Sequence, residues 1–269
     1  MLTGSIVLYK SNSEVLLKAI NSFLFSELVK KLYLIDNSPT DELKNICDDI
    51  RIEYIHNPSN PGFGAAHNIA IQESINEGSK YHFIVNPDIY FSEDVISPMV
   101  KFMEEDAKIG MMMPQILNDD ATVQNLPKLL PSPFSILLRK FKRPSFIYKP
   151  FINNYELRTV PQNIIYEAPI LSGCFTLLNL DAIKEVGEYD DRFFMYFEDW
   201  DLSRRMNQKY KTIYFPKVSV YHGYESGANK SKKLFKIFLQ SAVHYFNKWG
   251  WFFDSERRKI NEKTLAQFK

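Results

Sequence analysis

Cysteine is scarce in this sequence, and long hydrophobic runs are absent. Among 269 residues there are two cysteines, Cys47 and Cys174, which lie far apart and outside any metal-ligand spacing. This excludes a disulfide framework and a cysteine-rich zinc site, and we expect two reduced, buried thiols in a cytosolic protein. Because no run reaches about 18 apolar residues, no segment is expected to cross a bilayer as a helix.

Charge of one sign and the common nucleotide-binding loops are lacking as well. The formal net charge is only +1, so no global field favours nucleic acid as a partner. The loop at 60–68 is neither G-x-G-x-x-G nor a phosphate-binding loop, which argues against a dinucleotide or ATP site. The first strand is expected almost at Met1, which leaves no room for a signal peptide and favours a cytoplasmic location.

Aromatic residues, in contrast, are abundant. They make up 14% of the chain, with 21 Phe and 15 Tyr, a share that suggests stacking platforms or an interfacial surface in addition to a core. The hydrophobic share of 45% and the charged share of 24% are ordinary for a globular protein. The length fits one large α/β domain or two small ones.

Short β-branched and aromatic runs alternate with helical patterns over the first 90 residues. Strands are expected at 5–9, 31–35, 52–56 and 82–85, and helices at 14–25, 43–50 and 65–77. Ser13 is expected to cap the first helix, and Ser92 a further helix at 92–103. This alternation predicts an α/β fold with a mostly parallel sheet flanked by helices.

Polar residues follow each of the four strands, and Asp88 is the most informative of them. Ligands of open α/β sheets bind at the carboxyl ends of the strands, so four polar sets at one edge favour a binding crevice over turn chemistry alone. We interpret Asp88 as a ligand of a divalent metal that holds the diphosphate of an activated sugar. The alternative is an Asn86-Pro87-Asp88 turn that merely ends its strand.

A proline-rich, basic excursion is expected at 118–168, with a short helix at 134–141. Inserted segments of this length tend to be binding loops or lids, so this one could meet phosphate headgroups or a phosphate-bearing acceptor, or else be a solvated loop. The remaining expected elements are a strand broken by Pro114 at 108–117, a strand at 171–180, a helix at 181–186 ended by Gly187, and a strand pair around Pro216 at 212–222.

Carboxylates gather between aromatic residues at 189–205. Glu198, Asp199 and Asp201 could be helix caps and dipole partners, but aromatic walls also raise the pKa of a carboxylate, as a general base requires. His222, at a strand end after this cluster, is a metal candidate. A helix at 231–253, with an apolar stripe between lysines, could pack on the domain, form a dimer contact or lie in the membrane interface.

Seven motifs occur in a fixed order between residues 5 and 222. They are SIVLY, IDNSPTD, NPGFGAAHN, VNPD, LSGCF, GEYDDRFFMYFEDWDLSRR and the terminal histidine of YFPKVSVYH. This ordered set resembles the bacterial inverting family 2 glycosyltransferases of GT-A fold. The segments LPSPFSILLRKF and YFNKWGWFFD resemble the branch that includes rhamnosyltransferases of O-antigen and capsule synthesis.

The resemblance implies a role for each motif. Asp199 of the Glu198–Asp199 pair would be the general base, and Asp88 and His222 would bind Mg²⁺ or Mn²⁺. Asn86 stands where the family's metal motif has its first aspartate, so metal affinity is expected to be modest. The implied nucleotide-sugar-binding residues are Tyr9, Asn12, Asp36, Asn60, Gly62, Gly64, Asn68, Asn86 and Asp88.

The implied reaction moves a sugar, L-rhamnose from dTDP-rhamnose or a hexose from a UDP-sugar, onto a glycan or an undecaprenyl-diphosphate-linked acceptor. A peripheral contact with the cytoplasmic face of the inner membrane and a homodimer are left open. The expected organisation is a GT-A domain at 1–225, with a donor half at 1–115 and an acceptor half at 116–225, followed by a helical extension at 226–269. A nucleotidyltransferase is disfavoured because residues 10–13 lack glycine. An inactive binding module is disfavoured by the intact Glu198–Asp199 pair.

Overall fold

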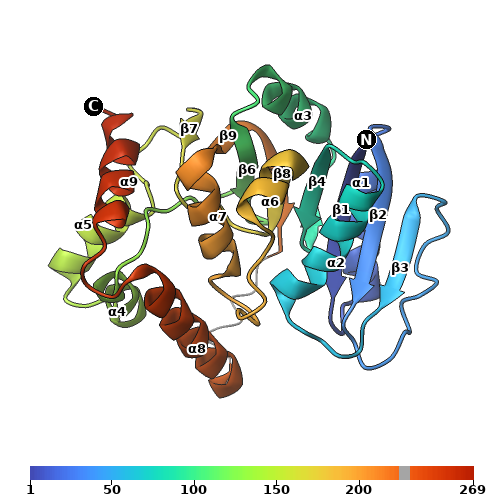
Figure 1. The fold of residues 1–269 in the computed structure, drawn as a ribbon, viewed down its shortest axis with the longest axis horizontal. Helices are drawn as coiled ribbons and strands as arrows, with labels where there is room; N and C mark the ends of the chain where they lie inside the picture. Colours follow the sequence, from blue (N-terminus) through green and yellow to red (C-terminus); the bar gives the residue numbers. More distant parts are fainter. Residues whose placement is uncertain (224–230) are drawn as a thin grey trace.

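A computed structural model describes residues 1–223 and 231–269 of the chain (Figure 1). The first half alternates strands and helices: β1 (Leu2–Leu8), α1 (Ser13–Leu24), β2 (Val29–Asp36), β3 (Ile52–His56), α2 (Phe63–Asn76), β4 (Tyr81–Val85), β5 (Ile89–Tyr90), α3 (Ile96–Glu105) and β6 (Ile109–Leu117). The second half is richer in helix: α4 (Pro133–Phe141), α5 (Ser145–Tyr155), β7 (Tyr166–Glu167), β8 (Phe175–Asn179), α6 (Leu180–Val186), α7 (Glu198–Lys209), β9 (Lys211–His222), α8 (Lys232–Trp249) and α9 (Ser255–Ala266).

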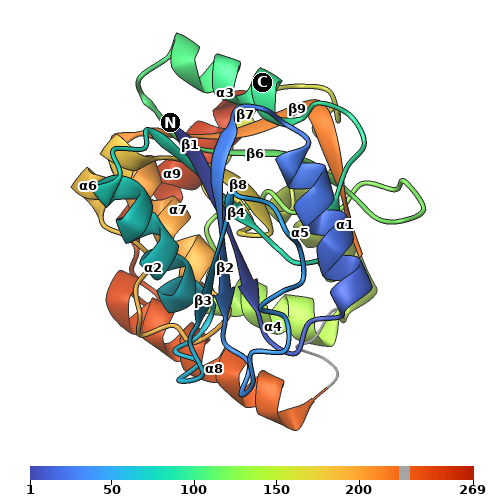
Figure 2. The ribbon, with the colours of Figure 1, turned by 90° about the vertical axis from the view of Figure 1, so that its right-hand side faces the viewer.

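One sheet runs through the described part of the molecule. Its order is β3-β2-β1-β4-β8-β6-β9-β5, with β7 pairing β9. The four N-terminal strands are parallel, whereas β8 is antiparallel to both of its neighbours, so the sheet is mixed beyond β4. Figure 2 shows α1 and α2 on opposite faces of this sheet. The predicted α/β class, with a largely parallel sheet between helices, is confirmed.

A hydrogen-bonded cluster of polar side chains lies inside the core beneath β1. Ser5 Oγ is 2.7 Å from both His67 Nδ1 and His82 Nε2, and Thr3 Oγ1 is 2.8 Å from His82 Nδ1. Both imidazoles are fully buried. Burial lowers the pKa of His82 to about 3 and that of His67 well below its ordinary value, so both rings are neutral in the folded protein.

These histidines should make folding stability fall in mild acid. The unfolded chain takes up protons below pH about 6.5, whereas the folded chain excludes them, so stability is present above that pH and lost as pH falls. At pH 5.5 the loss is about 1.4 kcal/mol for each ring. Urea unfolding at pH 7.5 and 5.5 should show His82→Gln losing less stability than the wild type does. Equal losses in the two proteins would contradict the neutral, buried His82.

Two predicted helix starts are wrong by a few residues. The cap of α1 is Asn12, not Ser13, because the Asn12 side chain accepts hydrogen bonds from the N–H groups of Glu14 and Val15. Helix α3 begins at Ile96 rather than Ser92, where the Asp94 side chain accepts from the N–H of Ser97. Asn and Asp accept such bonds as readily as Ser, so several acceptors near one start leave the boundary ambiguous.

Three other predicted elements are corrected. Residues 43–50 form turns and no helix, and the apolar Ile50 is fully exposed. The expected strand at 171–180 begins only at Phe175. The expected strand pair at 212–222 is the single strand β9. Its pairing with β6 shifts in register after the Pro114–Phe215 pair, and Pro216 lies in this irregular part of the strand. A bulge accommodates a proline without ending the strand. Helix α5 and the short strands β5 and β7 were not predicted.

The C-terminal helices are held to the domain by buried ion pairs. Asp201 accepts hydrogen bonds from Lys248 Nζ and Trp249 Nε1, and the buried Arg204 donates two bonds of 2.8 Å to Asp254. Phe197 and Tyr245 join the two segments in a second apolar cluster. The apolar stripe of α8 therefore packs on the domain. The predicted domain boundary at 225/226 lies outside the described residues.

Candidate active site

A cavity of about 570 Å³ lies at the carboxyl edge of the sheet, bounded by α4, α5 and α8. Asn86 and His222 line it at the sheet edge, and Glu198 and Asp199 line it at the start of α7. The remaining wall is basic and aromatic, and includes Lys128, Arg139, Lys140, Lys142, Arg158, Phe63, Tyr148, Tyr196, Phe235 and Phe238. The volume is that of a pocket for a small organic ligand.

Three predicted residues meet near the ends of β4 and β9, and two of them, Asn86 and His222, line the cavity. His222 Nε2 is 3.3 Å from Asp88 Oδ1 and 3.3 Å from Asn86 Nδ2. The segments of Asp88 and His222 are joined because β5 pairs with the end of β9, with Ile89 opposite His222. Asn86 Oδ1 is buried without a hydrogen-bond partner among the described residues. An oxygen in that state is costly unless a ligand meets it.

Gln124 fixes the orientation of the His222 ring, and sequence reasoning did not identify it. Its Nε2 donates to the His222 carbonyl (3.0 Å) and to Asn118 Oδ1 (2.8 Å), so its Oε1 must face the ring. That oxygen lies 3.3 Å from His222 Nδ1, which is therefore assigned the proton. The Nε2 lone pair then faces both the Asn86 Nδ2 donor and the Asp88 carboxylate, each at 3.3 Å, and a cation held by Asp88 could take the place of the Asn86 N–H as its partner.

The donor set suits Mg²⁺ or Mn²⁺ in combination with a diphosphate. Asp88 and Asn86 supply oxygens and His222 an imidazole nitrogen, which Mn²⁺ accepts readily. Within residues 1–223 and 231–269 no three His, Cys, Asp or Glu side chains form a cluster able to hold a metal. A bound cation therefore needs the amide of Asn86 and oxygens from its ligand, in agreement with a modest affinity.

Replacing Gln124 should weaken cation binding without touching a ligand. In Gln124→Leu the His222 ring loses its Nδ1 partner, and loss of such a partner raises the Kd for the metal by about 10- to 100-fold. Electron paramagnetic resonance of Mn²⁺, titrated with the protein and a nucleoside diphosphate, measures that Kd directly. Asn125→Ala, a change at the next residue, is the matched control. An unaltered Kd in Gln124→Leu would show that the ring needs no such support.

Glu198 and Asp199 also line the cavity and begin α7. The two residues directly before Glu198, Tyr196 and Phe197, have left-handed backbone conformations with φ of 70° and 69°. Such conformations cost about 1–3 kcal/mol each and are found at functional sites. The tight bend turns both carboxylates into the cavity, where Asp199 accepts bonds from the N–H groups of Gly173 (3.2 Å) and Trp200 (2.9 Å).

The environment raises the pKa of both carboxylates. Burial is the main cause for Glu198, whose pKa lies well above its ordinary value, and the neighbouring Asp199 charge adds to it. Burial also raises the pKa of Asp199, against the hydrogen bonds that it accepts and the charge of Lys128. Two adjacent carboxyls with elevated pKa values at a cavity wall are typical of a general acid–base site.

The loop at 60–68 packs against the segment that leads to Glu198. Gly62 has φ 111°, and a Cβ there would come within 2.3 Å of the Phe194 carbonyl oxygen, which also accepts a bond from the N–H of Phe63 (2.9 Å). Asn68 exchanges hydrogen bonds with the backbone of Tyr189 through both ends of its amide. These residues therefore hold the segment that leads to Glu198 in place. Asn60 and Gly64 lie in the same loop, where Gly64 also abuts Tyr189.

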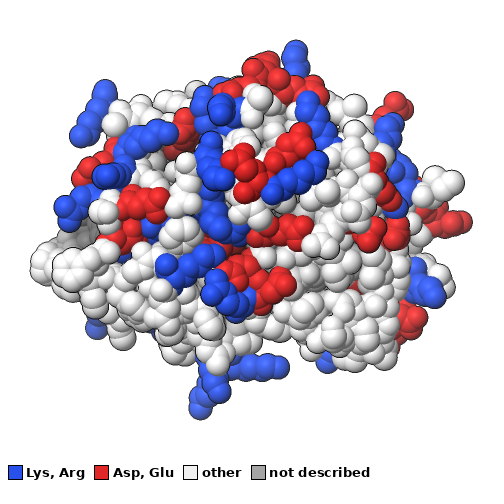
Figure 3. Space-filling model, viewed as in Figure 1, with Lys and Arg blue, Asp and Glu red and all other residues white. Residues whose placement is uncertain are grey.

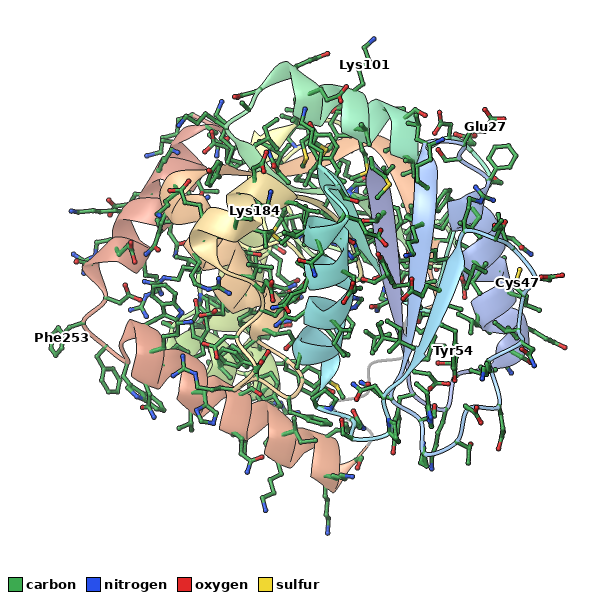
Figure 4. The ribbon with its side chains drawn as sticks, turned by 45° about the vertical axis from the view of Figure 1, so that its right-hand side comes forward. Glu27, Cys47, Tyr54, Lys101, Lys184 and Phe253 are labelled. Atoms are coloured by element: carbon green, nitrogen blue, oxygen red, sulfur yellow. The ribbon has the colours of Figure 1, made fainter. Side chains whose placement is uncertain are left out.

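The predicted nucleotide residues at the first two strand ends are placed as follows. Asp36 is buried at the end of β2 and accepts bonds from the N–H of Ser38 (2.9 Å) and the hydroxyl of Tyr54 (2.6 Å). Figure 4 shows Tyr54 near the lower end of β3. Tyr9 is exposed after β1, whereas the Asn12 side chain is used in capping α1. Direct contact of Asn12 with a ligand would require its release from that cap.

Lys128 is a further charged residue that the sequence did not single out. It is buried in the cavity wall, and its Nζ donates to the Leu126 carbonyl at 2.9 Å. Burial lowers its pKa to about 8, with Arg139 adding to the effect and Glu156 and Asp199 opposing it. A lone lysine within a proline-rich loop carries no local signal of burial.

Comparison with known proteins adds a family and two relatives. A family model described as "Glycosyl transferase family 2" matches residues 5–187. The N-acetylglucosaminyl-diphospho-decaprenol L-rhamnosyltransferase of Mycobacterium tuberculosis is 26% identical over 142 residues, 52% of this chain and 45% of its own. The rhamnosyltransferase WbbL of Escherichia coli K12 is 26% identical over 226 residues, 80% and 81% of the two chains. The chain thus spans less than half the length of the mycobacterial relative.

Among solved structures, GalNAc-T7 with UDP, GalNAc and Mn²⁺ is similar in fold. The TM-score is 0.62 at 16% sequence identity, over 90% of this chain and 47% of the other. At that identity the likeness concerns the fold alone. In the described part of the present chain, no helix is both long and apolar enough to traverse a bilayer.

Proposed function

The chain belongs to glycosyl transferase family 2 and has the GT-A fold, and from this premise we propose that it moves a sugar from a nucleoside diphosphate to an acceptor hydroxyl with inversion. One observation carries the proposal. Asn86 and His222, with Asp88 in contact, and the Glu198–Asp199 pair lie on two walls of one cavity. A leaving group held at the first wall and a base at the second suit a single displacement.

Each wall has a distinct task. Asp88, His222 and Asn86 would hold Mg²⁺ or Mn²⁺, which when bound neutralises the charge of the diphosphate. Asp199 accepts the proton of the acceptor hydroxyl. The N–H groups of Gly173 and Trp200 hold the Asp199 carboxylate in orientation. Its raised pKa makes it a stronger base than a solvated aspartate. The nucleotide base would lie near Asp36 and Tyr9, and Asn60 would line the nucleotide, whereas Gly62, Gly64 and Asn68 support the segment at 189–194 instead of meeting the ligand as predicted.

The donor and the acceptor are proposed from the relatives' names and the cavity's charge. Two relatives are named as rhamnosyltransferases, which favours dTDP-L-rhamnose over a UDP-hexose. The acceptor would be a glycan or an undecaprenyl-diphosphate-linked saccharide in the synthesis of a cell-surface polysaccharide such as O-antigen. The basic wall, in which Arg139 and Arg158 share the single carboxylate of Glu156 and Lys142 lies in the same lining, favours an acceptor that bears phosphate. A cytoplasmic location remains a prediction.

Ligand-induced melting with a panel of nucleotide sugars tests this function. We expect dTDP-rhamnose to raise the Tm in the presence of Mn²⁺ and less without it, because binding to the folded state stabilises it. A shift with UDP-hexoses alone would replace the donor and keep the reaction. No response to any dTDP- or UDP-sugar would remove the proposal in favour of an inactive binding module.

A further inference from the structure

Helix α4 presents an apolar stripe to solvent. Phe134, Leu137 and Phe141, at spacings of three and four residues, are 59%, 55% and 69% exposed. This spacing places them on one face of the helix, while Ser135 and Leu138 are buried on the other. Two phenylalanines and a leucine on one exposed face are more than scattered surface residues, and such contiguous patches mark interaction sites.

The stripe continues into a basic and aromatic segment. After α4 every residue from 142 to 147 is exposed, and Phe146 is 78% exposed. Lys142, Arg143 and Lys149 lie among these apolar side chains. No Asp or Glu occurs between residues 121 and 155. We call Phe134, Leu137, Phe141, Phe146 and Ile147 with these three cations the α4–α5 patch.

Neighbouring helices extend the patch on both sides. Lys140 Nζ lies 4.2 Å from the centre of the Phe235 ring of α8, so the end of α4 adjoins the start of α8. There Lys232, Lys233 and Lys236 are exposed, and the lower margin of the molecule around α8 in Figure 3 carries lysine or arginine but no acid. The two helices lie side by side in Figures 1 and 2.

The other end of α4 adjoins a second group of exposed aromatics. Arg257 donates to the carbonyl of Pro131, just before α4, and to that of Phe252 in the turn between α8 and α9. Phe252 is largely exposed and Phe253 entirely so, and Figure 4 shows Phe253 pointing away from the molecule. Exposed aromatic side chains therefore lie near the start of α4 as well.

We propose that the α4–α5 patch docks on the surface of a membrane that contains anionic lipid. Exposed aromatic and aliphatic side chains enter the boundary between headgroups and acyl chains, and interleaved lysine and arginine pair with lipid phosphate. Self-association is disfavoured, since a symmetric dimer would place the same cations of two copies against each other without any acid in the segment.

The patch and the cavity share one helix. Ile136 and Arg139 of α4 line the cavity, whereas Leu137 and Phe141 are turned to solvent. A docked membrane would therefore lie at the rim of the cavity. If the proposed function holds, a lipid-linked acceptor would present its hydroxyl from that surface; the docking itself depends only on the patch.

Co-sedimentation with vesicles, without donor or acceptor, tests the docking. Wild-type protein should bind phosphatidylcholine vesicles that contain phosphatidylglycerol, and bind them more weakly at high salt or in pure phosphatidylcholine. Substituting Phe134, Leu137 and Phe141 by serine should reduce the partition coefficient at least tenfold. A second variant, Arg143→Gln with Lys149→Gln, should reduce binding only to vesicles with phosphatidylglycerol. All five positions are exposed, and an unchanged Tm confirms that each variant is folded.

Matched controls separate the patch from general surface effects. Phe25→Ser with Val15→Ser removes two exposed apolar side chains of α1, and Lys30→Gln with Lys44→Gln removes two surface cations elsewhere. Both controls should bind like the wild type. Equal binding by patch variants and controls would overturn the proposal. The proposal would also be overturned if sedimentation velocity showed a dimer for the wild type and a monomer for the triple serine variant. The patch would then be a contact between two copies of the chain. Neither result alters the melting test of donor binding.

Discussion

Asp199→Asn should lower the transfer rate by about a hundredfold to ten-thousandfold while leaving donor affinity within a factor of about two. Asparagine keeps the size of the side chain but cannot take the hydroxyl proton, and its single amide oxygen can accept from only one of the Gly173 and Trp200 N–H groups, which Asp199 meets with separate oxygens. General base catalysis contributes about 10²- to 10⁴-fold, which sets the expected loss. Transfer is measured with a radiolabelled donor, and donor affinity by calorimetry with Mn²⁺.

The control for this variant is Asp181→Asn, an exposed aspartate at the start of α6. It should change neither quantity. Loss of donor binding together with transfer in Asp199→Asn would mean that this residue holds the donor rather than the acceptor. Because the pKa of Asp199 is raised, the wild-type rate should also fall as pH drops toward that pKa, and Asp199→Asn should lack this dependence.

Asp88→Ala should abolish the effect of Mn²⁺ on donor affinity. The variant removes the carboxylate and leaves the His222 imidazole at the site. Loss of a residue that only supports a metal ligand costs about 10- to 100-fold in metal affinity, so loss of a ligand itself should lower the donor affinity measured with Mn²⁺ by at least about 100-fold. Calorimetric titration with a nucleoside diphosphate, with and without Mn²⁺, measures both affinities. The value without metal should change little.

Asp119→Ala is a suitable control, because it removes a carboxylate close to Asp88 in the structure. Asp119 accepts a hydrogen bond from the hydroxyl of Tyr90, which lies two residues after Asp88 in the chain. It should retain the full metal effect. If Asp88→Ala responds to Mn²⁺ as the wild type does, the cation is held elsewhere.

The sequence was sufficient for the features that depend on neighbours along the chain. The apolar runs of β1, β2 and β4 and the 3.6-residue pattern of α1 are local, so their positions were predicted to within a few residues. The capping Gly187, with φ 85°, was also recognised from its place after a short helix. From these elements the sequence predicted that the polar residues after the parallel strands lie at one edge of the sheet.

Residues whose roles depend on distant partners could not be interpreted from the sequence. Gln124 is oriented by His222, 98 residues away, and Asn68 by Tyr189, 121 residues away. Gly62 indicated close approach, and the group that approaches it in this structure is the Phe194 carbonyl. Residues 43–50 had a helical apolar pattern, but with Asp48 and Asp49 near the expected C-terminus, acidic charges would oppose the helix dipole.

The sequence identified residues 118–168 as a proline-rich, basic excursion, but it predicted only part of how this segment folds. The short helix predicted at 134–141 is confirmed by α4, which has Pro133 at its first position, whereas α5, with Pro150 inside it, was not predicted. A proline at a helix start fits the helix without loss of a hydrogen bond. The alternation of exposed Phe141 and Phe146 with cations becomes meaningful only once their exposure is known.

The central claim is that a cation and a diphosphate lie at the Asn86–Asp88–His222 corner while Asp199 faces the acceptor from the opposite wall. A crystal structure with Mn²⁺ and dTDP, located by the anomalous signal of manganese, tests it most directly. The account predicts the ion within about 2.3 Å of oxygen or nitrogen atoms of Asp88 and His222, with the cavity open at Asp199. An ion bound instead between Glu198 and Asp199 would contradict it.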